Sequence, residues 1–217
     1  MNDNQNSNIR ELLPEPTIRR LPWYLAYVTL LRKNDVEYVS STKIADELNV
    51  DSSQIAKDLS FLNIKGKTRI GYEVASLEQA LRDFLGFDQS HNAVMVGSGS
   101  LGAALISDSG LQRYGLNIVA GVDIDPNIVG SEIGGIPIYH IDRLKELVKK
   151  MNIRIGIVAV PVDSAQDVAD TMVAAGIKGI WNFTPYRIRV RDGVVIANTS
   201  IYSHLALMYN RLGTLNL

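Results

Sequence analysis

The sequence of 217 residues contains no cysteine. This absence excludes disulfide bonds, thiol redox chemistry and cysteine-based zinc or iron–sulfur sites. If the protein responds to redox conditions, a bound cofactor must therefore report them.

Long apolar runs and an excess of charge are missing as well. The longest apolar stretches, such as residues 153–162, are interrupted by Arg154 and Gly156 and are too short to span a bilayer. Residues 1–8 are polar and lack the basic start and apolar core of a secretory signal, so we expect a cytoplasmic protein without membrane contact. Because the net charge is only −1, any binding to nucleic acid has to come from a local basic patch.

The length and the hydrophobic content of 46% are sufficient for two domains with separate cores. The first residues are polar and include Pro14 and Pro16, which fits a flexible arm. Near residue 86 the pattern changes from helices to short apolar runs that alternate with helices. We therefore predict an arm at residues 1–16, a first domain at 17–85, a second domain at 86–199 and a terminal helical segment at 200–217.

The first domain has the pattern of a winged helix-turn-helix. Apolar residues at helical spacing predict a helix over residues 17–33, in which Pro22 marks either the regular start or a bend. A short helix is expected at residues 42–48, and Asp51 with Gln54 forms the capping-box pattern of another helix. Residues 65–72 carry glycines and alternation typical of a hairpin.

Local charge in this domain points to nucleic acid. Residues 52–72 hold four basic side chains against one acidic side chain, Asp58. The first residues of a recognition helix face base edges, while basic residues of a wing neutralise phosphates. The candidate DNA contacts are Arg19 of a cationic first helix, then Ser52, Ser53, Gln54, Lys57, Lys65, Lys67, Arg69 and Tyr72. Two other interpretations stay open, because single charges often only solvate a surface and many winged helices bind proteins.

The second domain is predicted to be α/β, with a parallel sheet and right-handed crossovers. Strands are expected at residues 93–96, 117–122, 153–160 and 177–183, and helices at residues 101–107, 142–151 and 164–175. Residues 187–199 are interpreted as a hairpin that turns at Asp192 and Gly193. The terminal segment, with a helix over residues 200–211, places Ile201, Leu205, Met208 and Leu212 on one apolar stripe.

A glycine-rich motif follows the first of these strands and opens a helix. It reads Gly97, Ser98, Gly99, Ser100, Leu101, Gly102 and matches the dinucleotide-binding pattern G-x-G-x-x-G. The first glycine permits a tight turn, the second lets the backbone approach a pyrophosphate, and the third lets helix and strand pack closely. The alternative is that three glycines merely make a tight turn.

Acidic residues after the next strand favour the nucleotide interpretation. Asp123, Ile124 and Asp125 follow that strand, and Asp123 lies 26 residues beyond Gly97. A carboxylate at this distance holds a ribose 2′-hydroxyl and would repel a 2′-phosphate, so the pattern predicts NAD(H) rather than NADP(H). We prefer Asp123 to Asp125 for this role.

Two further strand ends are candidates for the same pocket. Val160 with Pro161, and Asn182, stand where the carboxyl ends of strands line cofactor sites. An equally good explanation is that these residues only end a strand and begin a loop. No residue pattern suggests catalysis or a metal site.

The combined motifs resemble Rex, the bacterial family of redox-sensing transcriptional repressors. The resemblance runs from about Arg19 to the terminal helix, and rests on the following segments: Arg19-Arg20-Leu21-Pro22, Lys57-Asp58-Leu59-Ser60, Gly71-Tyr72, the glycine motif, Val122-Asp123-Ile124-Asp125-Pro126, Val160-Pro161 and Asn182-Phe183. It implies a homodimer that represses genes from a palindromic double-stranded operator when NAD+ prevails and leaves the operator when NADH binds. It also implies that the last helix is swapped between subunits. Family members often have tyrosine where this chain has Asp108, aspartate where it has Ser200 and arginine where it has Ala56.

Other functions remain as alternatives. A dehydrogenase is disfavoured, because the chain has no Tyr-x-x-x-Lys pair, its three histidines are scattered and no substrate domain follows. A CoA-binding regulator is a second alternative, which Asp123 disfavours because CoA carries a 3′-phosphate. A scaffold without ligands is the third. We expect a non-enzymatic repressor that binds NAD(H).

Overall fold

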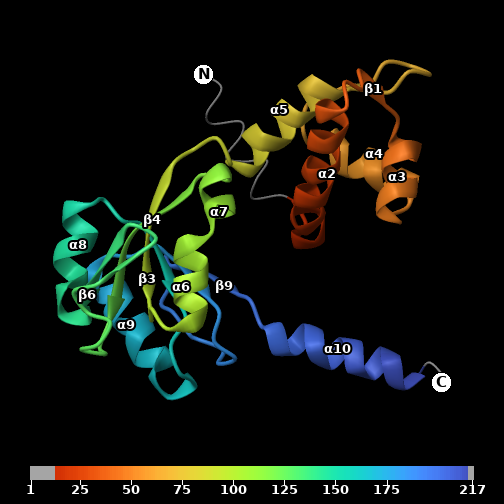
Figure 1. Ribbon diagram of the computed structural model, residues 1–217. Helices are drawn as coiled ribbons and strands as arrows, with labels where there is room; N and C mark the ends of the chain where they lie inside the picture. Colours follow the sequence, from red (N-terminus) through yellow and green to blue (C-terminus); the bar gives the residue numbers. More distant parts are fainter. Residues whose placement is uncertain (1–12, 215–217) are drawn as a thin grey trace. The chain divides into compact units, whose positions relative to one another are not determined.

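The computed structural model describes residues 13–214 and divides into two compact units, Met1–Gln89 and Ser90–Leu217 (Figure 1). The division lies beyond the predicted boundary at residue 85. The reason is local, because Gly86 ends a helix in the left-handed conformation and Phe87 then packs against the core of the first unit. Residues 86–89 therefore belong with the first unit.

The first unit begins with a long helix, α2 (Glu15–Lys33). The other elements of this unit are β1 (Tyr38–Val39), α3 (Ser41–Leu48), α4 (Ser52–Ser60), β2 (Tyr72–Glu73) and α5 (Val74–Leu85). Helix α2 starts two residues before the predicted position and continues through Pro22. Pro16 lies in its first turn, where a missing N–H costs no hydrogen bond, and Leu13 is buried against the core. Residues 13–16 are thus part of the fold, and the rest of the predicted arm lies outside the described residues.

Helices α3 and α4 form the predicted helix-turn-helix. The Ser40 side chain caps α3 by accepting the N–H of Lys43, and Asp51 caps α4 by accepting the N–H groups of Ser53 and Gln54. The predicted capping box is only half formed, because the Gln54 side chain turns to Asp58 instead. The shared core is built from the following buried side chains: Leu21, Tyr24, Leu25, Val28, Ile44, Ile55, Leu59, Leu77 and Leu81.

The wing is shorter than the predicted hairpin. Within residues 65–72 it has one bridge, between Lys67 and Gly71, and β2 then pairs antiparallel with β1. Gly71 has a φ of +106°, and a Cβ at this position would lie 2.3 Å from the backbone oxygen of Val39. Only glycine allows the wing to approach β1 so closely.

The second unit contains a seven-stranded sheet in the order β5-β6-β4-β3-β7-β8-β9. The strands are β3 (His91–Val96), β4 (Leu116–Asp123), β5 (Glu132–Ile133), β6 (Ile136–His140), β7 (Ile155–Val158), β8 (Gly179–Asn182) and β9 (Val195–Asn198). Every neighbouring pair is parallel except β5 and β6. The four predicted strands are confirmed as β3, β4, β7 and β8. The β5–β6 hairpin, which turns at Gly134 and Gly135, was not predicted.

Helices cover both faces of this sheet (Figure 1). They are α6 (Ser100–Ser107), α7 (Ser109–Arg113), α8 (Leu144–Lys150) and α9 (Ala165–Ala175), with 3-10 turns η1 (Ile141–Arg143) and η2 (Val162–Ser164). Side chains alternate along β3: Ala93 and Met95 join a cluster with Ile106 of α6, whereas Val94 and Val96 pack with α8 and α9. The predicted α/β layers are confirmed, while α7 was missed.

The hairpin predicted at residues 187–199 is wrong. The turn exists, with Gly193 at a φ of +85°, but only β9 is a strand, and it runs parallel to β8. The preceding segment is held by a side chain instead of a strand: the N–H of Arg189 donates to Gln166 Oε1, and Gln166 Nε2 donates to the carbonyl of Arg189. Alternation alone could not reveal this pairing with α9.

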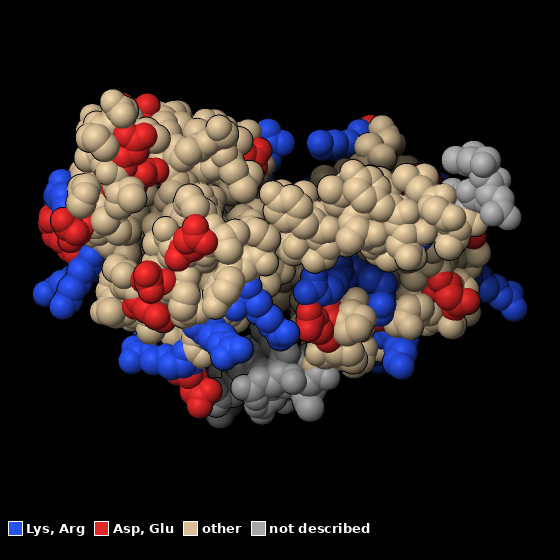
Figure 2. All heavy atoms as spheres, turned by 90° about the horizontal axis from the view of Figure 1, so that it is seen from below, with Lys and Arg blue, Asp and Glu red and all other residues tan. Residues whose placement is uncertain are grey.

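The last helix, α10 (Ile201–Thr214), has no buried side chain within the described chain. Large apolar side chains are exposed along it: Ile201, Tyr202, Leu207, Met208, Tyr209 and Leu212. Arg211 is its one charged residue, and the side of the helix that Figure 2 shows is almost entirely tan. Among the described residues, no helix is long and apolar enough to cross a membrane.

Candidate nucleotide site and nucleic-acid interface

The carboxyl ends of four strands meet in one row of the second unit. Val122 pairs with Val96, Val96 with Val158, and Val158 with Asn182, so β4, β3, β7 and β8 end side by side. From β3 the chain moves outward on one side to β4 and β6, and it then crosses back to β7 on the other side, so the strand order reverses between β3 and β7 and the topological switch point lies there. Open α/β sheets bind ligands in the crevice at this point. All the predicted nucleotide residues lie at or shortly after these four strand ends.

The first and third glycines of the motif are required by packing. A Cβ on Gly97, whose φ is +89°, would lie 2.5 Å from the backbone oxygen of Ala159. A Cβ on Gly102 would lie 2.0 Å from the backbone oxygen of Gly97. Both distances are too short for a side chain, so the close approach of β3, β7 and α6 depends on glycine. The positive φ of Gly97 agrees with the tight turn predicted for it, and the contact at Gly102 agrees with the close packing of helix and strand predicted for the third glycine.

Gly99 faces open space. No atom of the described residues lies within 4 Å of a Cβ built there, and Gly99 is the N-cap of α6. Ser100 and Leu101, which follow in the first turn, are exposed. Free N–H groups and the positive end of a helix dipole suit an anion, and the missing side chain lets a phosphate approach. Ser98 differs, because its side chain is buried and its hydroxyl has no hydrogen-bond partner within residues 13–214.

Asp123 closes the glycine turn from the neighbouring strand. Its Oδ2 accepts the N–H of Ser98 at 2.6 Å, and its Oδ1 accepts the N–H groups of Ile124 and Asp125 at 2.7 and 3.0 Å. A carboxylate offers roughly four acceptor positions, so one is left for a ribose hydroxyl. The sequence placed Asp123 near the ligand but did not reveal that it also holds the turn.

Asp125 is engaged in a local turn. Its Oδ1 accepts both the backbone and the side-chain nitrogen of Asn127, at 2.9 and 2.8 Å. This supports the preference for Asp123 as the carboxylate that faces the glycine motif. Ile124, between the two acids, exposes 72% of its surface and offers an apolar platform at the end of β4.

The remaining predicted ligand residues divide into two kinds. Val160 is brought to the motif, since its Cγ1 lies 2.8 Å from a Cβ built on Gly97, and Pro161 next to it is exposed. Asn182 is fully buried, and its amide is committed: it donates to the carbonyl of Tyr186 and to Asn198, and accepts two hydrogen bonds from Thr184. The prediction that Asn182 contacts the cofactor is corrected accordingly. It shapes the loop after β8.

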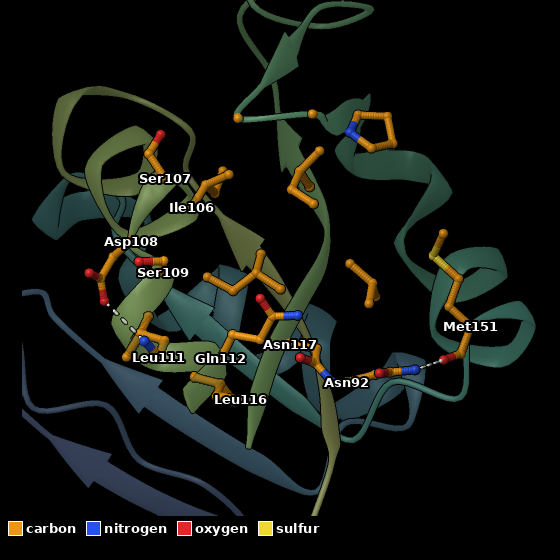
Figure 3. Close-up of a pocket in the computed structure, with 16 residues that line it drawn as sticks. Asn92, Ile106, Ser107, Asp108, Ser109, Leu111, Gln112, Leu116, Asn117 and Met151 are labelled. Carbon is orange, nitrogen blue, oxygen red and sulfur yellow. Dashed lines mark hydrogen bonds between the residues drawn. The ribbon is translucent and has the colours of Figure 1, made fainter. Parts of the chain in front are cut away.

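A crevice of about 680 Å³ lies elsewhere in this unit. It opens at the amino ends of β3, β4 and β6, opposite to the glycine turn. Figure 3 shows Ile106 and Asp108 along one side and Met151 on the other. Asp108 is its one charged lining residue and caps α7 by accepting the N–H of Leu111. Without a lining cation or a free helix start, this crevice does not suit a dinucleotide.

The start of α4 presents a polar surface in the first unit. Ser52, Ser53 and Lys57 are exposed, and Gln54 is half-buried. Hydrogen bonds from the Ser53 side chain and from the N–H groups of Ser53 and Gln54 keep the pKa of Asp51 below its ordinary value, so the cap remains charged. This first turn has the exposure that base contact requires.

A buried carboxylate beneath this turn was not predicted as functional. Asp58 is fully buried and accepts hydrogen bonds from Thr17, Arg20 and Tyr24 of α2 and from Gln54 of α4. Burial alone would raise the pKa of Asp58, but these hydrogen bonds outweigh it and lower the pKa. The sequence signal that could have indicated its burial is the position of this acid between the apolar residues Ile55 and Leu59 of the same helix. Arg20 of α2 is therefore neutralised by Asp58, as Arg32 is by Glu78.

The basic residues of the wing and of α2 are accessible. Lys67 donates to the Tyr38 hydroxyl, which raises the pKa of Lys67, and lies 4.6 Å from the centroid of that ring. Lys65 and Arg69 are exposed. Arg69 has a φ of +64°, a backbone conformation that residues other than glycine rarely adopt. Arg19 is exposed and pairs with Glu15. Tyr72 is partly buried and packs against the core of the first unit.

Two family models match the chain. The model described as "Putative DNA-binding protein N-terminus" matches residues 13–60, and the "CoA binding domain" model matches residues 88–186. Their boundaries agree with the helix-turn-helix and with the strand and glycine turn described above. The first match lies within the first unit, and the second lies in the second unit except for residues 88 and 89.

Full-length relatives are more specific. The redox-sensing transcriptional repressor Rex of Bacteroides fragilis is 55% identical over 200 residues, which cover 92% of this chain and 91% of the relative. RSP, a Rex-family repressor, was solved with β-NAD+ and operator DNA; it is 34% identical, with a TM-score of 0.89 and 93% coverage of both chains. The structure of RSP with β-NADH gives a TM-score of 0.85 at 34% identity, covering 93% of this chain and 95% of that one. On this sequence identity and coverage, the chain belongs to the Rex family of redox-sensing transcriptional repressors.

Proposed function

We propose that this protein binds operator DNA through α4 and the wing, and that NAD(H) bound at the glycine turn controls this binding. The observation that carries the proposal is the junction of Gly99, Asp123 and Val160 at the switch point of the sheet, in a chain whose other unit exposes a recognition helix. Relatives that share both units have been solved with NAD+, NADH and operator DNA. The protein acts as a repressor and not as an enzyme, as its relatives do.

The proposed response is release of the operator when NADH binds. NAD+ and NADH differ only at the nicotinamide, so the residues that distinguish them lie beyond the glycine turn, near Val160 and Pro161. A ligand that binds both states equally shifts nothing, and a change from about 1:99 to 99:1 requires roughly 5.5 kcal/mol of differential affinity. NADH must therefore prefer the state that does not fit DNA.

A homodimer is the proposed working form. The exposed apolar side chains of α10 have no cover within the described chain, and a second copy of the chain can supply it. Two copies related by a twofold axis present two recognition helices to the half-sites of a palindrome. The cytoplasm is the proposed compartment, because operator DNA and the NAD(H) pool of a bacterium are both there.

A mobility shift assay tests the proposal. The probe is a palindromic duplex selected by the protein from a randomised pool, titrated with NADH at fixed total NAD(H). We expect NADH to release the duplex and NAD+ to leave it bound. If neither nucleotide changes the shift, the sensing function is refuted even where DNA binding persists.

A CoA-binding regulator is the second candidate, favoured by the family model that matches residues 88–186. Calorimetric titrations with NADH, NAD+, NADPH and CoA separate the two. Because the Asp123 carboxylate faces the glycine turn, we expect NADH and NAD+ to bind and NADPH to bind at least tenfold more weakly. Tight binding of CoA alone would support the second candidate.

A further inference from the structure

The side chain of Gln54 is held in one orientation by a buried acid. Its Nε2 donates to Asp58 Oδ1 at 2.8 Å. A carboxylate can only accept hydrogen bonds, so the NH2 end of the amide must face Asp58 and the oxygen must occupy the other position. Thr17, Arg20 and Tyr24 keep Asp58 charged and fixed, because they supply its other hydrogen bonds at 2.7 to 3.0 Å.

The orientation of the amide determines what Gln54 can offer to a ligand. Its oxygen has no hydrogen-bond partner among residues 13–214, and one of its two amide N–H groups is used by Asp58. What remains is one acceptor and one donor on the same amide. Gln54 is half-buried in the first turn of α4, and exposed Ser53 and Lys57 lie on either side of it in sequence.

One acceptor beside one donor matches a single base edge of the major groove. Adenine presents its N6 amino group as a donor and N7 as an acceptor, whereas guanine presents two acceptors, N7 and O6. A freely rotating glutamine can turn both N–H groups towards guanine. Gln54 cannot, because Asp58 already takes one of them.

We propose that Gln54 recognises one adenine in each operator half-site, and that Asp58 is a positioning residue that excludes guanine by fixing the Gln54 amide. This inference rests on the proposed function, since it requires α4 to enter the major groove. It extends that function by naming the base and the buried group that selects it.

Selection from a randomised duplex pool, followed by sequencing of the bound molecules, tests the base preference of the full-length protein. The wild type should select one adenine per half-site that Gln54→Leu no longer selects. For the duplex with that adenine, we expect Gln54→Leu to bind about tenfold or more weakly than the wild type, and to bind all four bases at that position alike. Gln79→Leu is the matched control, because Gln79 is an exposed glutamine on α5 that also bonds to acids, Asp83 and Asp88. It should leave the whole profile unchanged.

Two further variants test the role of Asp58. Asp58→Asn no longer fixes the orientation of the Gln54 amide, because asparagine can present either an acceptor oxygen or a donor NH2 to it. Gln54 can then turn its own NH2 outward, so guanine should become acceptable where the wild type requires adenine, while preferences elsewhere persist. Gln54→Glu removes the donor but keeps an outward acceptor, so preference should move towards cytosine N4, and this result does not depend on the stability of Asp58→Asn.

The outcomes are distinct. An equal loss of affinity for every sequence with Gln54→Leu, with the same bases still preferred, would overturn the inference while leaving the proposed function intact. Failure of the wild type to retain any duplex would refute the proposed function and the inference together.

Discussion

Replacing two glycines of the motif one at a time separates ligand contact from packing. Gly102→Ala would place a Cβ 2.0 Å from the backbone oxygen of Gly97, about 1 Å closer than real Cβ contacts allow. The oxygen belongs to the backbone of the turn after β3 and the Cβ is attached directly to the backbone of α6, so α6 must move away from this turn. Overpacking of this kind costs about 1–3 kcal/mol, and the gain of up to about 1 kcal/mol from removing a helical glycine does not offset it fully. Gly99→Ala meets no atom within 4 Å in the described chain, so its stability should stay within about 0.5 kcal/mol of the wild type.

The expected results differ in kind. Thermal denaturation should show a fall in Tm on the order of 5 °C for Gly102→Ala and almost none for Gly99→Ala. Calorimetry should show weaker binding of NADH by Gly99→Ala, because the added methyl group fills the space where a phosphate approaches the N–H groups of α6. Loss of one charge-assisted hydrogen bond, about 1.5–3 kcal/mol, corresponds to at least tenfold weaker binding. Wild-type affinity of Gly99→Ala for NADH would show that the phosphate does not lie at this turn.

Three other predictions concern charge and assembly. The hydrogen bonds of Asp58 lower its folded-state pKa, so the stability that Asp58 contributes is present above the unfolded pKa of about 3.9 and is lost as the pH falls through the folded pKa. The Tm difference between the wild type and Asp58→Asn should therefore shrink in a denaturation series from pH 7 to pH 3. A constant Tm difference would contradict the assignment. Arg69→Ala should weaken binding to all duplexes alike and reduce the slope of log affinity against log salt by about 1, as measured by mobility shift across salt concentrations. Met208→Glu places a charge on exposed α10 and should convert dimers to monomers in sedimentation at micromolar concentration; an unchanged dimer would mean that another surface holds the copies together.

The sequence predicted the elements whose signals are local. Glycine spacing and the capping acceptor at Asp51 were sufficient for the turn at Gly97 and for the start of α4, because backbone conformation fixes both. The α/β class followed from alternation of strands and helices. What failed depends on contacts between distant residues: the pairing of Arg189 with Gln166 replaced a predicted strand.

The same distinction holds for the candidate site. Asp123 was predicted from its distance along the chain, but its hydrogen bond to Ser98 exists only because β3 and β4 are neighbours in the sheet. Asn182 was assigned to the cofactor by its strand-end position, although its amide is used by three hydrogen bonds within the loop after β8 and by one to Asn198 of β9. Asp58 looked like a surface charge, and only the packing of α2 on α4 shows that it is buried.

The hydrogen bond from Ser98 to Asp123 has a consequence for what the protein measures. This hydrogen bond holds the turn in place before any ligand binds. The pyrophosphate, which both redox forms share, therefore meets a preorganised surface, and little conformational entropy is lost on binding. Where the total concentration of NAD(H) exceeds both dissociation constants, the oxidised and reduced forms compete for a site that is always occupied. Under such saturation the output follows the proportion of the two forms, and a change in the total pool at constant proportion leaves gene expression where it was.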